Sequence, residues 1–253
     1  MRLRLSILFL LAFFVASFLF ADESTSLLQQ GNQHYQTGEY QKAAEAYERI
    51  LQIGQENWQV YYNLGNAYYK LRQPGKAILN YERARRLHPD HEDIRFNLDL
   101  ANLLVADRIP EPPRSAVLIW LESVLQFFSL EGSAALALIF WVALFAGLMM
   151  SMMSRQAKGQ QWGRMLAWPA GLLFLVFAGL FAYQYYDAQT TSYGIVMAPR
   201  VSVRSSPSQD ATEVFILHEG AKARFEEKTG DWRRIRLADG KVGWLPAHAV
   251  EKI

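Results

Sequence analysis

The sequence contains no cysteine, which excludes disulfide bonds, thiolate metal ligands and a cysteine nucleophile. It holds only five histidines in 253 residues, and its formal net charge is +2. A nucleic-acid-binding protein normally presents a basic face, so this charge balance argues against a nucleic-acid partner. Only His88 and His91 stand close together, and we expect them to lie in a turn rather than to hold a metal ion.

Motifs of the common catalysts are missing as well. The sequence contains no Gly-x-Ser-x-Gly elbow, no phosphate-binding loop and no His-Glu-x-x-His pair. A catalytic site needs a nucleophile with a base, a pair of carboxylates or a set of metal ligands. We therefore expect a protein that is not an enzyme and that carries no cofactor and no metal.

Charge is missing from two long stretches. Residues 132–154 and 165–186 contain no Asp, Glu, Lys or Arg. Because a helix needs about 20 residues to cross a bilayer, we predict a hairpin over 132–186 with transmembrane helices at 133–153 and 166–186. Gly171 and Gly179 are candidates for a close helix contact. The expected interfacial anchors are Trp162, Trp168, Tyr183, Tyr185 and Tyr186.

The topology follows from two charge patterns. Arg155, Lys158 and Arg164 separate the two spans with no acid among them, which places that connection in the cytoplasm. At the N-terminus, two arginines precede an apolar stretch, which predicts a signal peptide over residues 1–21. Leu19 is bulky for a cleavage site, so an uncleaved anchor stays open. Either way, we expect the flanking domains on the external or periplasmic side of a bacterial cytoplasmic (inner) membrane.

The region before the spans repeats itself. The run Gly65-Asn66-Ala67-Tyr68-Tyr69 follows Gly31-Asn32-Gln33-His34-Tyr35 by 34 residues, and Ala77 and Tyr81 follow Ala43 and Tyr47 by the same offset. This period predicts an all-α domain over 22–108, with helix-pair repeats at 24–57 and 58–91 and a capping helix over 92–106. The second copy, with Tyr61, Leu64, Gly65, Tyr68, Ala77, Tyr81, Ala84 and Pro89, resembles the tetratricopeptide repeat.

That resemblance implies a concave groove, lined by the first helix of each repeat, that binds a partner protein. Asparagine amides can hydrogen-bond an extended peptide, and tyrosines supply rigid apolar area with a polar tip. For Tyr68 and Tyr81 we expect packing between helices instead, and this alternative stays open for Tyr62 and Tyr69. The candidate groove residues are Leu28, Asn32, Tyr35, Gln36, Tyr62, Asn66, Tyr69, Lys70 and Phe96.

One subset of tetratricopeptide repeats binds a free C-terminal carboxylate through basic residues. Asn32 and Asn63 match the pattern of that subset. Its basic positions are occupied here by Leu28, Asp93 and Asn97. A free carboxylate is therefore not the expected ligand.

A connector over 109–131 follows the repeats. Ile109-Pro110-Glu111-Pro112-Pro113 is expected to be extended. Residues 116–129 are apolar and aromatic but include Glu122 and Gln126. This pattern indicates either a helix lying in the membrane interface or a soluble helix that covers the open end of the repeats.

Residues 193–253 alternate short β-rich runs with turns. The series Val201-Ser202-Val203, Gly230-Asp231-Trp232 and Val242-Gly243-Trp244 resembles a bacterial SH3-like domain, which implies a small all-β barrel. Asp239-Gly240 predicts a hairpin turn. We expect Trp232, Ile235, Val242 and Leu245 in the core, and Trp244 in the core or in a groove. Arg233, Arg234 and Arg236 form either a solvated face balanced by nearby acids or a contact for an anionic partner.

The order of these parts predicts a multidomain chain with a tetratricopeptide array, two transmembrane helices and an SH3-like barrel. This order of modules resembles that of the BatE family, the tetratricopeptide-repeat proteins of the bacterial Bat (aerotolerance) operon. The resemblance is supported by the run Asn97-Leu98-Asp99-Leu100-Ala101-Asn102. The resemblance implies von Willebrand-type Bat membrane proteins and a MoxR-type ATPase system as partners in oxidative-stress tolerance. The alternative is a cell-envelope protein that contacts peptidoglycan through the barrel.

Overall fold

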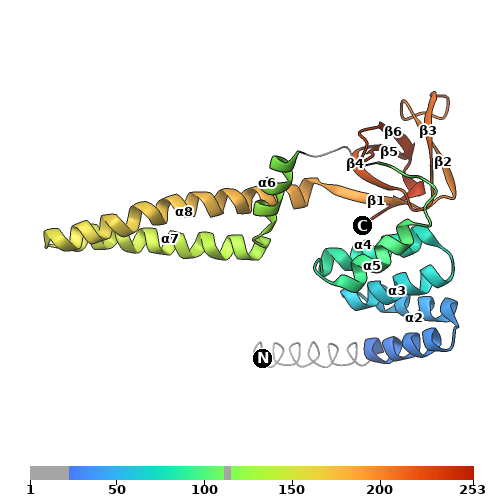
Figure 1. The fold of residues 1–253 in the computed structure, drawn as a ribbon, viewed down its shortest axis with the longest axis horizontal. Coiled ribbons are helices and arrows are strands. Elements are labelled where there is room, and N and C mark those ends of the chain that lie inside the picture. The colour runs from blue at the N-terminus through green and yellow to red at the C-terminus, as the bar shows by residue number, and fades with distance from the viewer. Residues whose placement is uncertain (1–22, 111–114) are drawn as a thin grey trace, which may run out of the picture. The chain divides into compact units, whose positions relative to one another are not determined.

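Local sequence signals set the ends of the N-terminal helices. The computed structural model describes residues 23–110 and 115–253, so the expected signal peptide and residues 111–114 lie outside the described part. A helix over residues 23–36 precedes α2 (Tyr40–Gln52), α3 (Trp58–Lys70), α4 (Pro74–Leu87) and α5 (Glu92–Asn102) (Figure 1). Asn57 caps α3 by accepting a hydrogen bond from the Val60 amide at 2.9 Å. Pro74, which lacks an amide proton, begins α4.

Small residues bring consecutive helices together. Tyr47 and Tyr81 are almost fully buried, and their rings lie directly against Gly31 and Gly65. A Cβ at Gly65 would stand only 2.7 Å from the Tyr81 ring. Glycine is therefore the residue that allows this tyrosine to fill the space between α3 and α4.

The end of α3 carries backbone strain. Arg72 adopts a φ of 58° at the position where the preceding repeat has Gly38, with a φ of 79°. A left-handed residue ends a helix favourably when it is glycine, whereas a side chain there costs about 1 kcal/mol.

We expect Arg72→Gly to raise the free energy of unfolding by about 1 kcal/mol, because glycine adopts this φ without a steric penalty. Chemical denaturation of the purified protein measures the change. Arg95→Gly is the matched control, because Arg95 is exposed in the interior of α5. There glycine should lower the free energy of unfolding by about 1 kcal/mol. Equal effects of the two substitutions would contradict the assignment of strain to Arg72.

The capping helix is shorter than expected. α5 ends at Asn102, whereas the sequence predicts helix to residue 106, and Val105 lies in the chain that follows. Ile94, Leu98 and Ala101 are buried on one face of α5. Val105 packs against the same helical core from outside the helix, so its apolar character reflects burial and not helical periodicity.

The C-terminal domain is a seven-stranded antiparallel sheet in the order β3-β2-β6-β5-β4-β1-β7. Its core contains Val203, Leu217, Phe225, Ile235 and Leu245. Asp239 and Gly240 lie in the turn that joins β5 to β6. The strands are β1 (Ser192–Val196), β2 (Arg200–Arg204), β3 (Glu213–His218), β4 (Lys222–Thr229), β5 (Trp232–Arg236), β6 (Val242–Pro246) and β7 (Val250–Lys252).

The expected core of this domain needs correction. Ile235 and Leu245 are fully buried, but Trp232 and Val242 are only half-buried and lie outside the core cluster. Side chains alternate between the faces of a strand. In β6 the buried residues are Gly243 and Leu245, so Val242 and Trp244 share the opposite face.

The sheet packs directly on the helical array, and the two form one unit over residues 23–110 and 193–253. Ile195 of β1 is fully buried within the helical core. Glu82 of α4 is 6% exposed and binds Lys222 at 2.7 Å and Arg85 at 2.6 Å. Asp107 Oδ2 accepts a hydrogen bond from the backbone amide of His218 at 2.5 Å, and Asp107 Oδ1 lies 2.9 Å from His218 Nδ1. The Glu82–Lys222 and Asp107–His218 contacts each join residues that are more than 100 positions apart.

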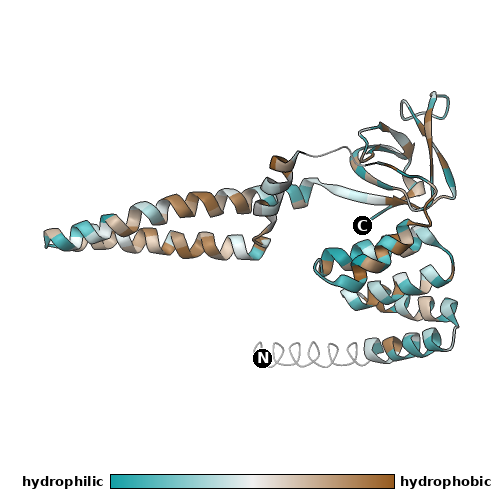
Figure 2. Ribbon diagram, in the orientation of Figure 1, coloured by the Kyte–Doolittle hydropathy of each residue, from teal (hydrophilic) through white to brown (hydrophobic). Residues whose placement is uncertain are grey.

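Residues 115–192 form a second unit of three helices, α6 (Ala116–Gln126), α7 (Leu130–Met153) and α8 (Ala157–Thr190). By length and composition, α7 and α8 are both able to cross a membrane. Figure 2 shows apolar residues along most of both helices. α8 begins at Ala157, not at residue 166, so Lys158 and Arg164 lie in its first turns and only Arg155 lies in the connection.

α7 and α8 come into close backbone contact at two glycines that the sequence analysis did not indicate. A Cβ at Gly163 of α8 would stand 2.5 Å from the Ser151 amide nitrogen and 2.6 Å from the Gly147 carbonyl oxygen. At Gly179 a Cβ would meet no atom within 4 Å, and at Gly171 it would meet only Leu144 at an ordinary 3.4 Å. Gly147 and Gly163, not Gly171 and Gly179, therefore allow α7 and α8 to touch through their backbones.

A polar network holds the other end of the hairpin. Gln184 of α8 donates to the carbonyl oxygens of Leu125 and Phe128 at 2.9 and 2.8 Å and accepts from the buried Ser133 hydroxyl at 2.8 Å. The two carbonyls stand at the end of α6 and in the turn before α7, where helix ends leave backbone oxygens unpaired. One glutamine thus joins all three helices.

Candidate peptide-binding groove

An asparagine amide in the first repeat is fixed by two donors. The Oδ1 atom of Asn32 accepts a hydrogen bond from the Tyr47 hydroxyl at 2.8 Å and another from Asn63 Nδ2 at 3.3 Å. Tyr47 lies on α2 and Asn63 on α3, so the amide is held by the two helices that follow its own.

The second repeat forms the same arrangement. Asn66 Oδ1 accepts from the Tyr81 hydroxyl at 2.7 Å and from Asn97 Nδ2 at 3.2 Å. Each of these residues follows its counterpart in the first arrangement by 34 positions. Asn97 also donates to the Tyr62 hydroxyl at 2.7 Å, which ties α5 to the network.

The chemical consequence is a pair of oriented amide donors. Because both Oδ1 atoms face donors, each amide can take only one orientation. Within the part of the chain that the structure describes, the Nδ2 atoms of Asn32 and Asn66 donate to no other residue. Asn32 is exposed and Asn66 half-buried, so both amides remain within reach of a ligand. A carbonyl oxygen of an extended peptide is the acceptor that fits them.

A cavity of about 130 Å³ lies beside these amides, lined by Asn32, Tyr35, Gln36, Tyr47, Asn63 and Asn66. Four of the nine candidate residues therefore share this cavity. Leu28, Tyr62 and Tyr69 are half-buried and pack against the helical core. Lys70 and Phe96 are exposed, and 64% of the surface of Phe96 is accessible to solvent.

The network includes four residues outside the candidate set: Tyr47, Asn63, Tyr81 and Asn97. Asn63 and Asn97 stand 34 positions apart, as do Tyr47 and Tyr81. The repeat period therefore indicated that the members of each pair have the same role. We expected Tyr81 to pack between helices, and its ring does so, but its hydroxyl also orients Asn66.

Burial changes the ionisation of the network tyrosines. Desolvation raises the pKa of Tyr47 to about 12, and it also raises the pKa of Tyr81. Both groups therefore bind their proton more tightly in the folded state than in the unfolded state. Their contribution to stability is complete below pH 10, the ordinary pKa of tyrosine, and is lost as the pH rises through the folded-state pKa.

We expect the free energy of unfolding to fall steeply above pH 10. Ultraviolet absorbance of tyrosinate, recorded beside denaturation curves at each pH, measures ionisation and stability together. Tyr47→Phe should weaken this pH dependence, whereas Tyr186→Phe, at an exposed position of α8, should not. A stability that stays constant between pH 10 and 12 would contradict the prediction.

Other candidate features form no comparable site. His88 and His91 pack against Trp58 in edge-on and tilted arrangements, with ring centroids 5.1 and 4.6 Å from that of the indole. Over the described residues, no group of three or more potential metal ligands occurs. In the sheet, Arg234 and Arg236 pair with Glu226 at 3.3 and 2.5 Å, as expected of a solvated strand face.

Comparisons with known proteins bear on both domains. A tetratricopeptide-repeat family model matches residues 58–91, and a second TPR-repeat model matches residues 31–71. A bacterial SH3 domain model matches residues 199–251. A search of the curated proteins found no match.

Solved structures resemble parts of the chain. The first tetratricopeptide-repeat domain of Spaghetti (RPAP3), bound to an HSP90 peptide, is 16% identical, with a TM-score of 0.23 over 32% of this chain and 92% of that one. The MamA protein is 14% identical, with a TM-score of 0.33 over 67% of this chain and 96% of that one. The scores are too low to carry an argument about function.

The expected fold class is confirmed. The chain contains tetratricopeptide repeats and a bacterial SH3 domain, separated in sequence by two apolar helices long enough to span a membrane.

Proposed function

We propose that the protein is a non-enzymatic, membrane-anchored scaffold that binds an extended segment of a partner protein in its tetratricopeptide groove. The observation that carries this proposal is the pair of oriented amides at Asn32 and Asn66. Each presents an Nδ2 donor beside the groove while its oxygen is held by a buried tyrosine. Repeated donors of this kind suit a peptide backbone, whose carbonyls are available whatever its side chains.

Exposed apolar surface supports the anchor. Leu138, Ile139 and Leu172 keep more than half of their surface exposed, although a soluble protein rarely exposes large contiguous apolar patches. Trp162 and Trp168 are exposed near the cationic end of the hairpin, where aromatic belts form at membrane interfaces. We place the connection between α7 and α8 in the cytoplasm and both other domains on the periplasmic side of the inner membrane.

The order of the modules supports a BatE-like role. In that role the partners are von Willebrand-type Bat membrane proteins and a MoxR-type ATPase system, acting together in aerotolerance. The groove binds the periplasmic segment of one such membrane protein. Its position on an anchored chain raises the effective concentration of partners in the same membrane.

Asn32→Asp with Asn66→Asp tests the groove. Aspartate keeps the oxygen that accepts from tyrosine, so the helices stay packed, but it replaces each amide donor by a carboxylate oxygen. We expect partner capture to weaken at least tenfold, because two donors are lost and two charges face peptide carbonyls. Co-purification of the detergent-solubilised protein with mass spectrometry measures capture.

The control is Gln55→Glu with Asn57→Asp, which adds the same two charges at exposed positions outside the groove and keeps an acceptor at the α3 cap. This variant should capture the partner as well as the natural protein does. If Asn32→Asp with Asn66→Asp captures the partner as well as the natural protein does, the proposal is wrong.

A second function, contact with peptidoglycan, is favoured by the match to the bacterial SH3 domain. We expect the full-length protein in detergent to sediment with purified cell-wall sacculi. If the protein stays in the supernatant at every protein concentration tested, this second function is wrong.

A further inference from the structure

Three cationic side chains lie at the tip of the hairpin, where α7 ends and α8 begins. Arg155 lies in the connection between the two helices, and Lys158 and Arg164 lie in the first turns of α8. All three are exposed, and within the described residues none of them forms an ion pair. We call these three residues the hairpin cations.

No acidic side chain of α7 or α8 lies near the hairpin cations. The nearest acids along the two helices are Glu131, in the first turn of α7, and Asp187, close to the end of α8. Glu131 precedes Arg155 by 24 residues and Asp187 follows Arg164 by 23, so both acids stand more than about 30 Å away along the helices. Within α7 and α8 the hairpin cations therefore have no counter-charge.

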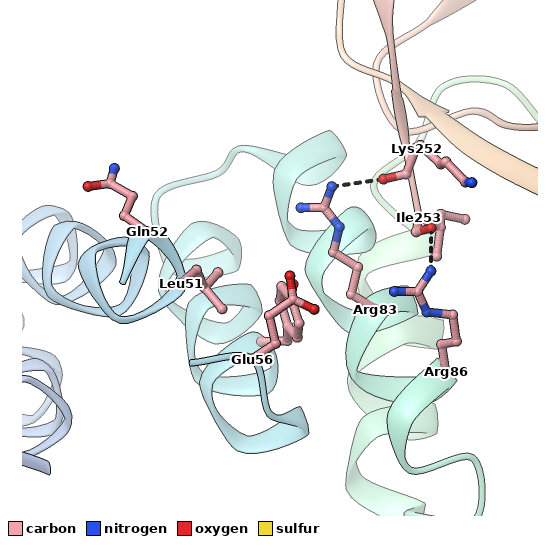
Figure 3. A pocket seen from close by; sticks show the side chains of 8 residues that line it. Leu51, Gln52, Glu56, Arg83, Arg86, Lys252 and Ile253 are labelled. Carbon is pink, nitrogen blue, oxygen red and sulfur yellow. Dashed lines mark hydrogen bonds between the residues drawn. The ribbon is translucent and has the colours of Figure 1, made fainter. Parts of the chain in front are cut away.

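Arginines in the other unit of the chain differ in this respect. Arg83 and Arg86 line a pocket beside the last strand of the sheet. Arg83 donates to the Lys252 carbonyl at 2.8 Å and pairs with Glu251 at 2.9 Å. Arg86 donates to the Ile253 carbonyl at 2.7 Å (Figure 3). The arginines of this pocket are thus bound by the protein itself, whereas the hairpin cations are available to an anion from outside.

A polar turn holds the hairpin cations together. Ser154 ends α7, and its hydroxyl accepts a hydrogen bond from the Gln156 amide at 3.3 Å. The Ser154 carbonyl accepts another from Gln160 Nε2 at 3.1 Å, which ties the first turn of α8 to the end of α7. Gly163, which contacts the backbone of α7, directly precedes Arg164. The three positive charges therefore stand on one ordered tip.

Each cation of α8 is paired in sequence with an exposed tryptophan. Trp162 follows Lys158 and Trp168 follows Arg164 by four residues, a spacing that makes two side chains neighbours on a helix surface. The exposed fractions of the two tryptophans are 64% and 80%. In both pairs the tryptophan lies one helical turn closer to the apolar part of the hairpin. This order matches a bilayer surface, where indole rings favour the interface and long cationic side chains reach outward to the phosphates.

The positions of the two arginines fit the phosphate layer. Arg155 follows the predicted span at 133–153 by two residues, and Arg164 precedes the span at 166–186 by two. Two residues of helix correspond to about 3 Å along the axis. The polar layer on each side of the hydrocarbon is about 5–7 Å thick. Both guanidinium groups therefore lie at the depth of lipid headgroups.

A phosphate with a net negative charge and an apolar tail fits these features. We infer that the hairpin tip binds anionic phospholipids in preference to zwitterionic ones. In an anionic phospholipid no amine neutralises the phosphate, so its charge is available to the hairpin cations, and its acyl chains contact Trp162 and Trp168. This inference rests on the proposed membrane anchor and adds a lipid class to it.

Quenching of tryptophan fluorescence by brominated lipid tests the inference on the full-length protein in nanodiscs. Two sets of nanodiscs have the same composition, phosphatidylcholine with a minor share of phosphatidylglycerol, and the same mole fraction of brominated lipid. Phosphatidylglycerol carries the bromine in one set, and phosphatidylcholine carries it in the other. The signal of the two tip tryptophans is the part of the quenching that Trp162→Phe with Trp168→Phe removes.

We expect brominated phosphatidylglycerol to quench the tip tryptophans about threefold more strongly than brominated phosphatidylcholine, because each cation near a membrane surface attracts anionic lipid. Arg155→Gln with Lys158→Gln and Arg164→Gln should make the two lipids quench equally. Arg155→Lys with Arg164→Lys keeps the charges and should keep the preference. Helical circular dichroism of the glutamine variant shows whether its helices are intact.

The matched control removes three cations from the other unit. Arg95→Gln with Arg108→Gln and Lys228→Gln changes the net charge by the same amount at exposed positions. This variant should prefer phosphatidylglycerol as strongly as the natural protein does. Soluble glycerol phosphate, added in excess, should leave the preference of the natural protein unchanged.

Four results would overturn the inference, and they differ in what they leave standing. Equal quenching of the natural protein by the two brominated lipids removes the lipid preference but leaves the membrane anchor intact. A preference that survives the three glutamines shows that the hairpin cations do not cause it. Loss of the preference in glycerol phosphate shows that the tip binds a soluble phosphate and not a lipid. Absence of quenching by either lipid removes the proposed anchor itself.

Discussion

Gly65→Leu is expected to lower the free energy of unfolding by about 3 kcal/mol. The new Cβ alone would stand 2.7 Å from the ring of Tyr81, which is 1% exposed and closely packed in the helical core. Overpacking of this kind usually costs about 1–3 kcal/mol. Displacing the Tyr81 ring also breaks the hydrogen bond that its hydroxyl donates to Asn66. The expected loss of stability therefore lies at the upper end of that range.

Gln59→Leu is the matched control for this substitution. It adds the same side chain to the same helix at an exposed position, where the expected change is within about 0.5 kcal/mol. Denaturation monitored by helical circular dichroism measures both variants. A Gly65→Leu protein as stable as Gln59→Leu would show that α3 and α4 are not packed as described. Because the substitution also moves Asn66, it should reduce partner capture as well.

Gly163→Leu is expected to separate the two long helices. A Cβ there would meet the Ser151 nitrogen and the Gly147 oxygen at 2.5 and 2.6 Å. These are backbone atoms of α7, so they can move only if the whole helix moves. We expect a loss of about 2 kcal/mol for the hairpin, since interior packing tolerates little displacement.

Hydrogen exchange of the detergent-solubilised protein reports this loss directly. Amides of α7 and α8 near Gly147 and Gly163 should exchange faster in Gly163→Leu than in the natural protein. Gly179→Leu provides the control, because a Cβ at Gly179 meets no atom within 4 Å. Equal exchange in the two variants would contradict the helix contact.

The repeat period explains why so much of the helical domain was predictable. A spacing of 34 residues places Gly65 with Gly31 and Tyr81 with Tyr47, and both pairs pack alike. The hydroxyl bonds of these tyrosines were not predicted, because apolar periodicity locates a ring in the core but does not say what its polar tip reaches. Asn63 and Asn97 repeat with the same period, which indicated a shared role without identifying it.

The sheet and the hairpin show where sequence patterns lose information. Trp232 and Val242 stand in β-rich runs, but which face of a strand is buried depends on register with its neighbours. Gly179 lies inside the apolar stretch of α8, whereas Gly163 lies before it beside Arg164, and the sequence does not say which of them faces α7. The contact between Glu82 and Lys222 joins residues 140 positions apart, so no local pattern describes it.

Site-specific photo-crosslinking in intact membranes tests the groove most directly. A photoreactive residue at Gln36, which lines the groove cavity, is compared with one at Gln41, which is exposed on α2 but does not line that cavity. We predict an adduct with a membrane-anchored partner from position 36 and not from position 41, and its loss when Asn32→Asp and Asn66→Asp are added. The same adduct from both positions, or an adduct that survives the two aspartates, would contradict binding through the oriented amides.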